Sequence, residues 1–234
     1  MTVVKKDECK IKLLFLSKRD FMTAQTVFSV YDDRNDRFFP GVQFEKQSNL
    51  FFTPPTSQLV IRARFINDNF NKCLITKKRK ECFTSGLLKS EEEEEEIDVT
   101  PPTKSSDSSS SDPFSIADIY EKSEIMRSTF SAPPDIVGRM VTNRMCFKWR
   151  DLSLQLDHAI LPSSERYELG CLIDPDKLPR KKVITLHDKC TGDCPIETIK
   201  EKIEKELEGW DVSFTPSRGS KYSQLLDDMG AGLV

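Results

Sequence analysis

The sequence is poor in the residues and patterns from which common active sites are built. It has 9 glycines and only 2 histidines in 234 residues. It contains no glycine-rich phosphate-binding loop, no nucleophile elbow and no metalloprotease motif. These absences argue against the usual nucleotide-binding, serine-hydrolase and zinc-protease mechanisms. The sequence therefore predicts that the chain is not an enzyme.

Long hydrophobic runs are also missing. Lys5, Lys6, Asp7 and Glu8 precede only a short apolar run, which is unlike a secretory signal, and no segment approaches the length needed to cross a bilayer. The 7 cysteines are an odd number and do not form the dense framework of a small secreted scaffold. We expect a protein of the cytoplasm, the nucleus or both, without a membrane partner.

One stretch, residues 89–113, has almost nothing apolar to bury. It holds the glutamate run Glu91–Glu96, the prolines Pro101 and Pro102, and the serine tract Ser105–Ser111. The entropy lost on ordering such a stretch is not compensated by burial. The sequence therefore predicts an acidic, Ser/Glu-rich disordered linker that divides the chain into two units.

Charge is distributed unevenly over these parts. Residues 1–88 carry 16 Lys and Arg against 9 Asp and Glu, the linker carries 2 against 9, and residues 114–234 carry 17 against 20. An acidic linker beside a basic unit can fold back on it and compete with an anionic partner. Phosphate groups would strengthen that competition, and candidate phosphorylation sites are Ser90, Ser109 and Thr100.

The first unit is predicted to be a basic β-rich domain. Ile61, Ala63 and Phe65 alternate with Arg62 and Arg64, so one face of this strand is apolar and the other is cationic. Turn signals at short intervals and sparse helical patterns favour a β-sandwich or a small barrel.

The cations of this unit suggest a nucleic-acid surface, because phosphates need cations and bases need aromatic stacking partners. The four consecutive cations near residue 80 also resemble a nuclear-import signal. Ordinary solvated side chains on a strand and a loop explain the same pattern. The candidate residues are Arg62, Arg64, Lys77, Lys78, Arg79 and Lys80.

Residues 114–214 are predicted to form an α+β domain. Alternation over residues 150–160 predicts a strand, and an apolar stripe from Ile196 to Trp210 at spacings of three and four predicts an amphipathic helix. Residues 215–234 are predicted to be a flexible C-terminal tail. The expected fold class is therefore α+β, with two units joined by a disordered linker.

The nearest approach to a metal site is His187 with Cys190 and Cys194, which Cys171 could complete. Imidazole and thiolate are ligands that zinc uses, but this spacing is not that of a standard zinc finger or ribbon. A turn with incidental cysteines is the favoured explanation of these residues. We expect no cofactor, with zinc as the alternative.

Three candidate functions follow from these features. The leading one is a non-enzymatic regulatory protein, from a eukaryote or a virus that infects one, whose basic head is gated by the phosphorylatable linker and binds a protein partner. The second is an RNA- or DNA-binding viral accessory protein, of the silencing-suppressor or movement type, acting through residues 1–88. The third is a small zinc-binding module.

Overall fold

Strand β1 (Val4–Phe15) is hydrogen-bonded along both of its edges, and this closes the sheet into a barrel. One edge pairs with β8 (Glu165–Ile173) and the other with β5 (Leu87–Asp98), both antiparallel. The computed structural model describes residues 2–30, 42–54, 59–84, 87–100, 112–149, 152–173, 195–217, 219 and 221–228.

Eight strands form the barrel wall in the order β5-β4-β3-β2-β6-β7-β8-β1, and β1 returns to β5. A short ninth strand pairs with the end of β1, on the edge that β5 leaves free, and every strand pair is antiparallel. The remaining strands are β2 (Gln43–Phe52), β3 (Val60–Ile66), β4 (Lys72–Thr84), β6 (Gly138–Trp149), β7 (Leu152–Ile160) and β9 (Phe214–Pro216).

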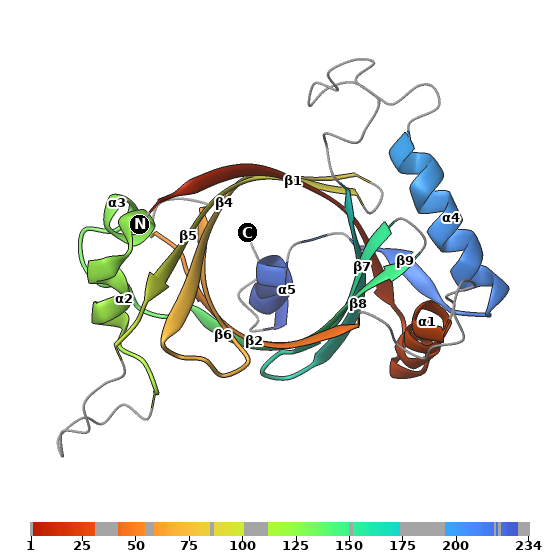
Figure 1. Cartoon of the computed structure of the whole chain (residues 1–234), viewed down its shortest axis with the longest axis horizontal. Coiled ribbons are helices and arrows are strands. Elements are labelled where there is room, and N and C mark those ends of the chain that lie inside the picture. The colour runs from red at the N-terminus through yellow and green to blue at the C-terminus, as the bar shows by residue number, and fades with distance from the viewer. Residues whose placement is uncertain are drawn as a thin grey trace.

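Helices cover two sides of the barrel (Figure 1). One pair lies outside the wall near β7 and β8, a second pair lies on the opposite side, and the last helix projects inside the ring of strands. The pair near β7 and β8 is α1 (Lys18–Val30) with α4 (Pro195–Gly209). The pair on the opposite side is α2 (Ile116–Lys122) with α3 (Glu124–Thr129), and the helix inside the ring is α5 (Lys221–Asp228).

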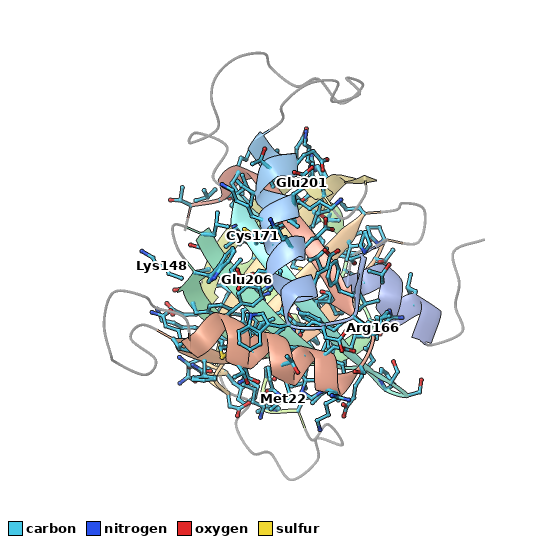
Figure 2. All side chains as sticks on the ribbon, turned by 90° about the vertical axis from the view of Figure 1, so that its right-hand side faces the viewer. Met22, Lys148, Arg166, Cys171, Glu201 and Glu206 are labelled. Carbon is cyan, nitrogen blue, oxygen red and sulfur yellow. The ribbon has the colours of Figure 1, made fainter. Side chains whose placement is uncertain are left out.

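The first outer core lies between the wall and helices α1 and α4. Figure 2 shows these two helices crossing the wall, with Met22 on α1 and Glu201 on α4. Strand residues Ile11 and Leu13 pack in the same buried cluster as Phe28 of α1. The amphipathic stripe predicted for α4 is largely confirmed, since Ile196, Ile203 and Leu207 are buried here, although Trp210 at its end is 52% exposed.

A second outer core lies between β3, β4 and helices α2 and α3. It contains Phe65 of β3 together with Ile119 and Met126 of the two helices. The Phe65 ring stacks on Phe114 with a centroid distance of 4.9 Å. Because successive side chains of a strand point to opposite faces, these apolar residues leave the alternate positions to the barrel interior.

The predicted two-unit α+β fold class is wrong, because one continuous barrel runs through both predicted units. Strands β1 to β5 come from residues 4–98 and β6 to β8 from residues 138–173, and β2 pairs with β6 across this division. The wall closes only when strands from both segments pair, since β1 needs both β5 and β8.

The start of the predicted disordered linker is also corrected. The glutamate run Glu91–Glu96 is part of β5, paired along its length with β4 and in part with β1. Glutamate disfavours strands, but opposite charges on neighbouring strands offset this cost. Lys5 lies opposite Glu93 in the register, and Lys78 lies opposite Glu92. Residues 101–111 lie outside the described residues.

The predicted flexible tail contains an ordered helix. Leu225 of α5 is fully buried in a cluster with residues from the ends of β2, β6 and β7. The Tyr222 hydroxyl lies 2.7 Å from the Thr53 hydroxyl, and its ring lies 5.5 Å from that of Phe51. Helix α5 is therefore packed inside the wall at one end of the barrel.

Candidate functional site

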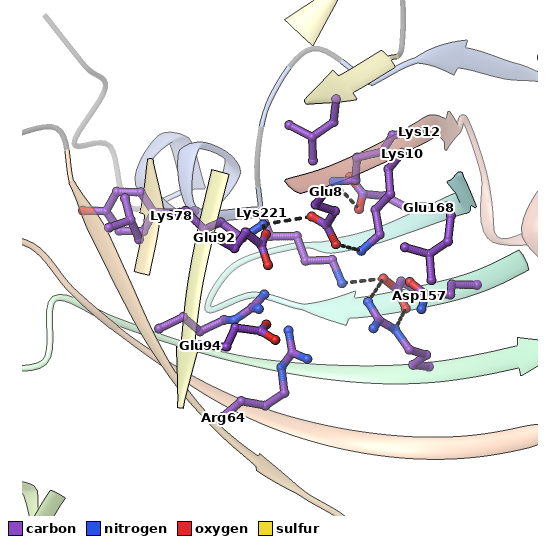
Figure 3. A pocket seen from close by; sticks show the side chains of 18 of the residues that line it. Glu8, Lys10, Lys12, Arg64, Lys78, Glu92, Glu94, Asp157, Glu168 and Lys221 are labelled. Atoms are coloured by element: carbon purple, nitrogen blue, oxygen red, sulfur yellow. Dashed lines mark hydrogen bonds and ion pairs between the residues drawn. The ribbon is translucent and has the colours of Figure 1, made fainter. Parts of the chain in front are cut away.

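The barrel encloses a cavity of about 260 Å³ whose walls are mainly charged. Every wall strand except β2 contributes at least one ionisable side chain, and α5 contributes another (Figure 3). The eight cations are Lys6, Lys10, Lys12, Arg62, Arg64, Lys78, Arg144 and Lys221. The five carboxylates are Glu8, Glu92, Glu94, Asp157 and Glu168.

Asp157 binds the two cations at one side of the cavity. Arg144 donates two hydrogen bonds to it, from Nε at 2.7 Å and from Nη2 at 2.8 Å. Lys221 of α5 adds a third contact at 2.6 Å. Burial alone would raise the pKa of Asp157, but Lys221 and Arg144 hold the pKa well below its usual value. The carboxylate therefore stays ionised and fastens α5 to the wall.

Glu8 of β1 is held between two lysines. Lys10 Nζ lies 2.5 Å from its Oε1, and Lys78 Nζ lies 3.3 Å from its Oε2. Burial alone would raise the pKa of Glu8, but Lys10 and Lys78 lower it strongly. Both carboxylate oxygens thus face an ammonium group.

The two glutamates of β5 that line the cavity are paired in the same way. Glu92 forms an ion pair with Lys78, and its Oε2 lies 3.9 Å from Lys6 Nζ. Glu94 Oε2 lies 2.7 Å from Lys6 Nζ, and its Oε1 accepts a 3.4 Å hydrogen bond from Thr76. These are alternate residues of the glutamate run, which explains why they share the inner face.

Two arginines on β3 differ from the other cavity cations in their partners. Arg62 Nη2 donates to the Thr76 hydroxyl at 3.3 Å, and its buried Nε has no hydrogen-bond acceptor in the described part of the chain. Arg64 Nε donates to the Asn49 side-chain oxygen at 3.3 Å. Within the residues that the structure describes, neither guanidinium forms an ion pair with a carboxylate. A cation in the barrel interior without a directly paired carboxylate is costly, and this favours binding of an anion at this wall.

The protonation of several cavity cations is shifted by the same surroundings. Burial lowers the pKa of Arg64 to about 9, and the charges of Arg62 and Arg144 act in the same direction. Burial also lowers the pKa of Lys10 to about 8 and that of Lys221 to about 7. An anion bound among these groups would stabilise their charged forms and so raise their pKa values again. The charged forms of these groups in turn favour binding of the anion.

The carboxylates of the cavity do not fit a preformed metal centre. No three His, Cys, Asp or Glu side chains converge as metal ligands within the described ranges. Hard cations such as Mg²⁺ need carboxylate oxygens directed at them. Here Glu8, Glu92 and Glu94 direct oxygens at lysines instead.

The predicted cationic surface is divided between the two faces of the wall. Arg62, Arg64 and Lys78 line the cavity, whereas Lys77 and Arg79 lie on the outer face, where both contact Glu93. The alternation in β3 is confirmed, but its cationic face points into the barrel instead of into open solvent. Lys80 lies in β4, and its side chain is outside the described part.

The predicted phosphorylation sites have different surroundings. Ser90 is 5% exposed on β5, and its hydroxyl donates to Glu92 at 3.3 Å. Thr100 follows β5 and is exposed, with its hydroxyl 2.7 Å from Lys122 Nζ. Ser109 lies outside the described residues. A kinase cannot reach Ser90 while the barrel is intact.

The proposed zinc ligands are not brought together by the described structure. Cys171 is fully buried on the outer face of β8, beneath the helices (Figure 2), and burial raises the pKa of its thiol to about 12. This disfavours the thiolate that zinc requires. His187, Cys190 and Cys194 lie outside the described residues, so zinc binding by them stays a prediction.

The sequence pattern did not identify most of the cavity residues. A signal was present in β1, where Lys6, Glu8, Lys10 and Lys12 occupy alternate positions. A strand that alternates charged and apolar residues normally has a wet face and a dry face. Here the charged face is enclosed, which only the closure of the sheet reveals.

No family model matches the chain, and no curated protein matches its sequence. Solved structures do resemble its fold. A proposed adenylyl cyclase from Hippeastrum, described as having a dominant triphosphatase activity, has a TM-score of 0.66 and 20% identity, with 97% of each chain covered. A proposed adenylate cyclase from Bacillus halodurans has a TM-score of 0.50 and 16% identity, over 92% of this chain and 96% of that one.

These findings correct the predicted function. The regulatory hypothesis required a mobile acidic linker, but the glutamates of that linker form a wall strand. The expectation of a protein that is not an enzyme is contradicted by the fold, which is shared with a protein described as having a dominant triphosphatase activity. The alternative functions of a viral nucleic-acid-binding protein and of a small zinc-binding module are likewise corrected by the fold shared with that protein, while zinc binding by His187, Cys190 and Cys194 stays a prediction.

The expected partner and the expected cellular location stay predictions. The predictions of a protein partner and of a cytoplasmic or nuclear location are not tested by the structure. Within the described ranges, no helix combines the length and the apolar character needed to span a membrane.

Proposed function

We propose that this chain binds the triphosphate group of a small substrate in the barrel cavity and hydrolyses one of its phosphoanhydride bonds. The observation that carries the proposal is the excess of eight cations over five carboxylates in the cavity inside the barrel. The shared fold with a protein described as having a dominant triphosphatase activity supports it.

The two arginines of β3 suit recognition of phosphate. A guanidinium group presents several N–H donors in one plane, and these match two oxygens of one phosphate. Arg62 and Arg64 are alternate residues of β3 and therefore point to the same side of the wall. They offer two such planes along one row, as successive phosphates of a chain require.

The size of the cavity favours a short phosphate chain. Its volume of about 260 Å³ lies just below the range of about 300–1,000 Å³ that is usual for drug-sized ligands. If the substrate is a nucleoside triphosphate, its phosphates enter the cavity and the nucleoside stays at the mouth. This arrangement favours attack on a phosphate over chemistry at the sugar.

The reaction requires none of the motifs that the sequence lacks. A water molecule adds to the terminal phosphorus and releases a proton to solvent, and the bond from that phosphorus to the bridging oxygen breaks. The products are orthophosphate and a phosphate chain shortened by one unit. Negative charge in the transition state spreads over the oxygens of the transferred group, so catalysis depends mainly on positioning and electrostatic stabilisation. Arg62 and Arg64 are the residues we assign to this stabilisation.

Phosphate release tests the proposal. Purified full-length chain is incubated with inorganic tripolyphosphate or with ATP, both with magnesium and with EDTA. We expect turnover, and we expect Arg64→Gln to lower kcat/KM by about 100-fold, as for loss of one preorganised donor to the transition state.

Arg127→Gln is the matched control, because Arg127 is exposed on α3 and its Nε donates to the Ser123 carbonyl at the start of that helix. It should retain full activity. Absence of phosphate release from both substrates under both conditions would refute the proposal, and so would an Arg64→Gln protein that is as active as the parent.

A further inference from the structure

The lysines of the cavity occupy the places at which a divalent cation would have to bind. On the inner face of β1, Lys10 and Glu8 are two positions apart, and Lys10 Nζ lies 2.5 Å from Glu8 Oε1. The other oxygen of Glu8 faces Lys78 at 3.3 Å. A metal ion at Glu8 would have to displace an ammonium group on either side.

The same holds on β5, the neighbouring strand. Glu92 is paired with Lys78, and its second oxygen faces Lys6. Glu94 directs one oxygen at Lys6, 2.7 Å away, and the other at the Thr76 hydroxyl. A divalent cation placed between these carboxylates would therefore be close to several fixed positive charges, which repel it.

The remaining wall also favours an anion without its metal. Arg62 and Arg64 have no carboxylate partner among the described residues, while Lys12 pairs with Glu168 and Arg144 with Asp157. Mg²⁺ in protein phosphate sites is usually held by one or two carboxylates together with substrate phosphates. Each of the five carboxylates in the described cavity wall already faces a cation, so sharing it with Mg²⁺ would break an ion pair.

We propose that the cavity takes its triphosphate ligand as the metal-free polyanion, with Lys10 in the position where a divalent cation would otherwise bridge protein and phosphate. This inference rests on the proposed function for the location of the site. Magnesium then competes with the cavity for the ligand, because it complexes the phosphate oxygens that the lysines and arginines need. Phosphoryl transfer in this site relies on the protein's own cations.

Calorimetric titration with inorganic tripolyphosphate tests this directly, since it measures binding and needs no turnover. The full chain is titrated in EDTA and again in excess magnesium chloride, with potassium chloride added to equalise ionic strength and thus screening. We expect binding in EDTA and a dissociation constant about tenfold or more higher in magnesium, the loss expected when charge-assisted contacts are removed.

Lys10→Glu is the diagnostic variant. It places a second carboxylate beside Glu8, so affinity in EDTA should fall by about tenfold or more, and magnesium should now increase affinity instead of lowering it. Lys10→Met, which removes the charge without reversing it, should weaken binding in EDTA and leave the effect of magnesium in its original direction. Arg127→Gln should behave as the parent, and circular dichroism confirms that each variant is folded.

The possible outcomes distinguish failure of this inference from failure of the proposed function. Binding that requires magnesium, or that magnesium strengthens in the unmodified chain, overturns this inference and leaves the proposed function in place. No binding in either condition overturns both. If Lys10→Glu does not fold, the comparison of EDTA and magnesium on the unmodified chain still gives the answer.

Discussion

Lys221 Nζ lies 2.6 Å from Asp157 Oδ2, and this contact joins the last described helix to the wall of the barrel across 64 residues of sequence. The same carboxylate also receives two hydrogen bonds from Arg144. One buried carboxylate thus holds a wall strand and the internal helix together.

Loss of this contact should destabilise the barrel in a graded manner. Lys221→Met removes one cation and leaves Asp157 paired with Arg144, so we expect the free energy of unfolding to fall by about 1–3 kcal/mol. Asp157→Asn leaves two buried cations without their counter-ion, and we expect a larger loss of about 3–5 kcal/mol. Urea denaturation measures both, and Lys205→Met on the exposed side of α4 is the control. Equal effects of the two variants would contradict this account.

Anion binding should depend on pH through the buried lysines. Burial lowers the pKa of Lys221 to about 7 and that of Lys10 to about 8, so both lose their charge as the pH rises through this range. Affinity for tripolyphosphate in EDTA should therefore fall between pH 7 and pH 8. Because tripolyphosphate itself titrates, the parent is compared with Lys221→Met. The variant should show a weaker fall, and identical pH profiles would count against a role for Lys221.

Stability without ligand should change in the opposite direction. An unfolded lysine has a pKa of 10.5, whereas that of folded Lys221 is about 7, so between these values the unfolded chain binds more protons. The free energy of unfolding therefore rises with pH over this window, and the contribution is lost as pH falls through the folded pKa. Melting temperatures measured across the window should rise more for the parent than for Lys221→Met.

Arg64 on β3 should lower the stability of the free protein and contribute to tripolyphosphate binding. Its side chain is half-buried and has no carboxylate within ion-pair distance among the described residues, and loss of solvent around it lowers its pKa to about 9. Arg64→Met should therefore raise the free energy of unfolding of the free protein by about 1–2 kcal/mol, as for other buried charges replaced by apolar groups. The same variant should lose the thermal stabilisation that tripolyphosphate gives the parent. A destabilised variant that retains this stabilisation would show that Arg64 serves the fold alone.

Neighbouring glutamates of the acidic run should differ sharply in their effect on stability. Glu95 is 2% exposed and accepts hydrogen bonds from the Ser123 hydroxyl and from the Glu124 and Ile125 amides at the start of α3. Glu95→Ala should cost about 2–3 kcal/mol, since several buried donors lose their acceptor.

Glu96→Ala is the matched control for this prediction. The Glu96 side chain is 61% exposed and pairs with Lys72, so its removal should change stability by less than about 0.5 kcal/mol. Binding of tripolyphosphate should be unaffected in both variants, because neither residue lines the cavity. Similar unfolding curves for the two variants would contradict the assigned roles.

The acidic run shows where local sequence composition fails to predict the structure. A window around Glu91–Glu96 contains almost no apolar residue, which predicts disorder, and the charges that compensate it lie elsewhere in the chain. Lys6 is contributed by β1 and Lys78 by β4, and the helix that Glu95 caps follows after a further 28 residues. A count of local composition cannot include partners that only strand pairing brings close.

The amino-acid sequence by itself determined the alternation of strands such as β3 and the buried stripe of α4, because both follow from the local periodicity of apolar residues. Only the tertiary structure decided which face of each strand is enclosed. Closing the sheet through β1 turned the charged faces of strands distant in sequence toward one another, and so converted ordinary polar positions into a cationic cavity. The physical reason is that a strand's periodicity separates its two faces, whereas the direction of each face depends on pairing with the other strands.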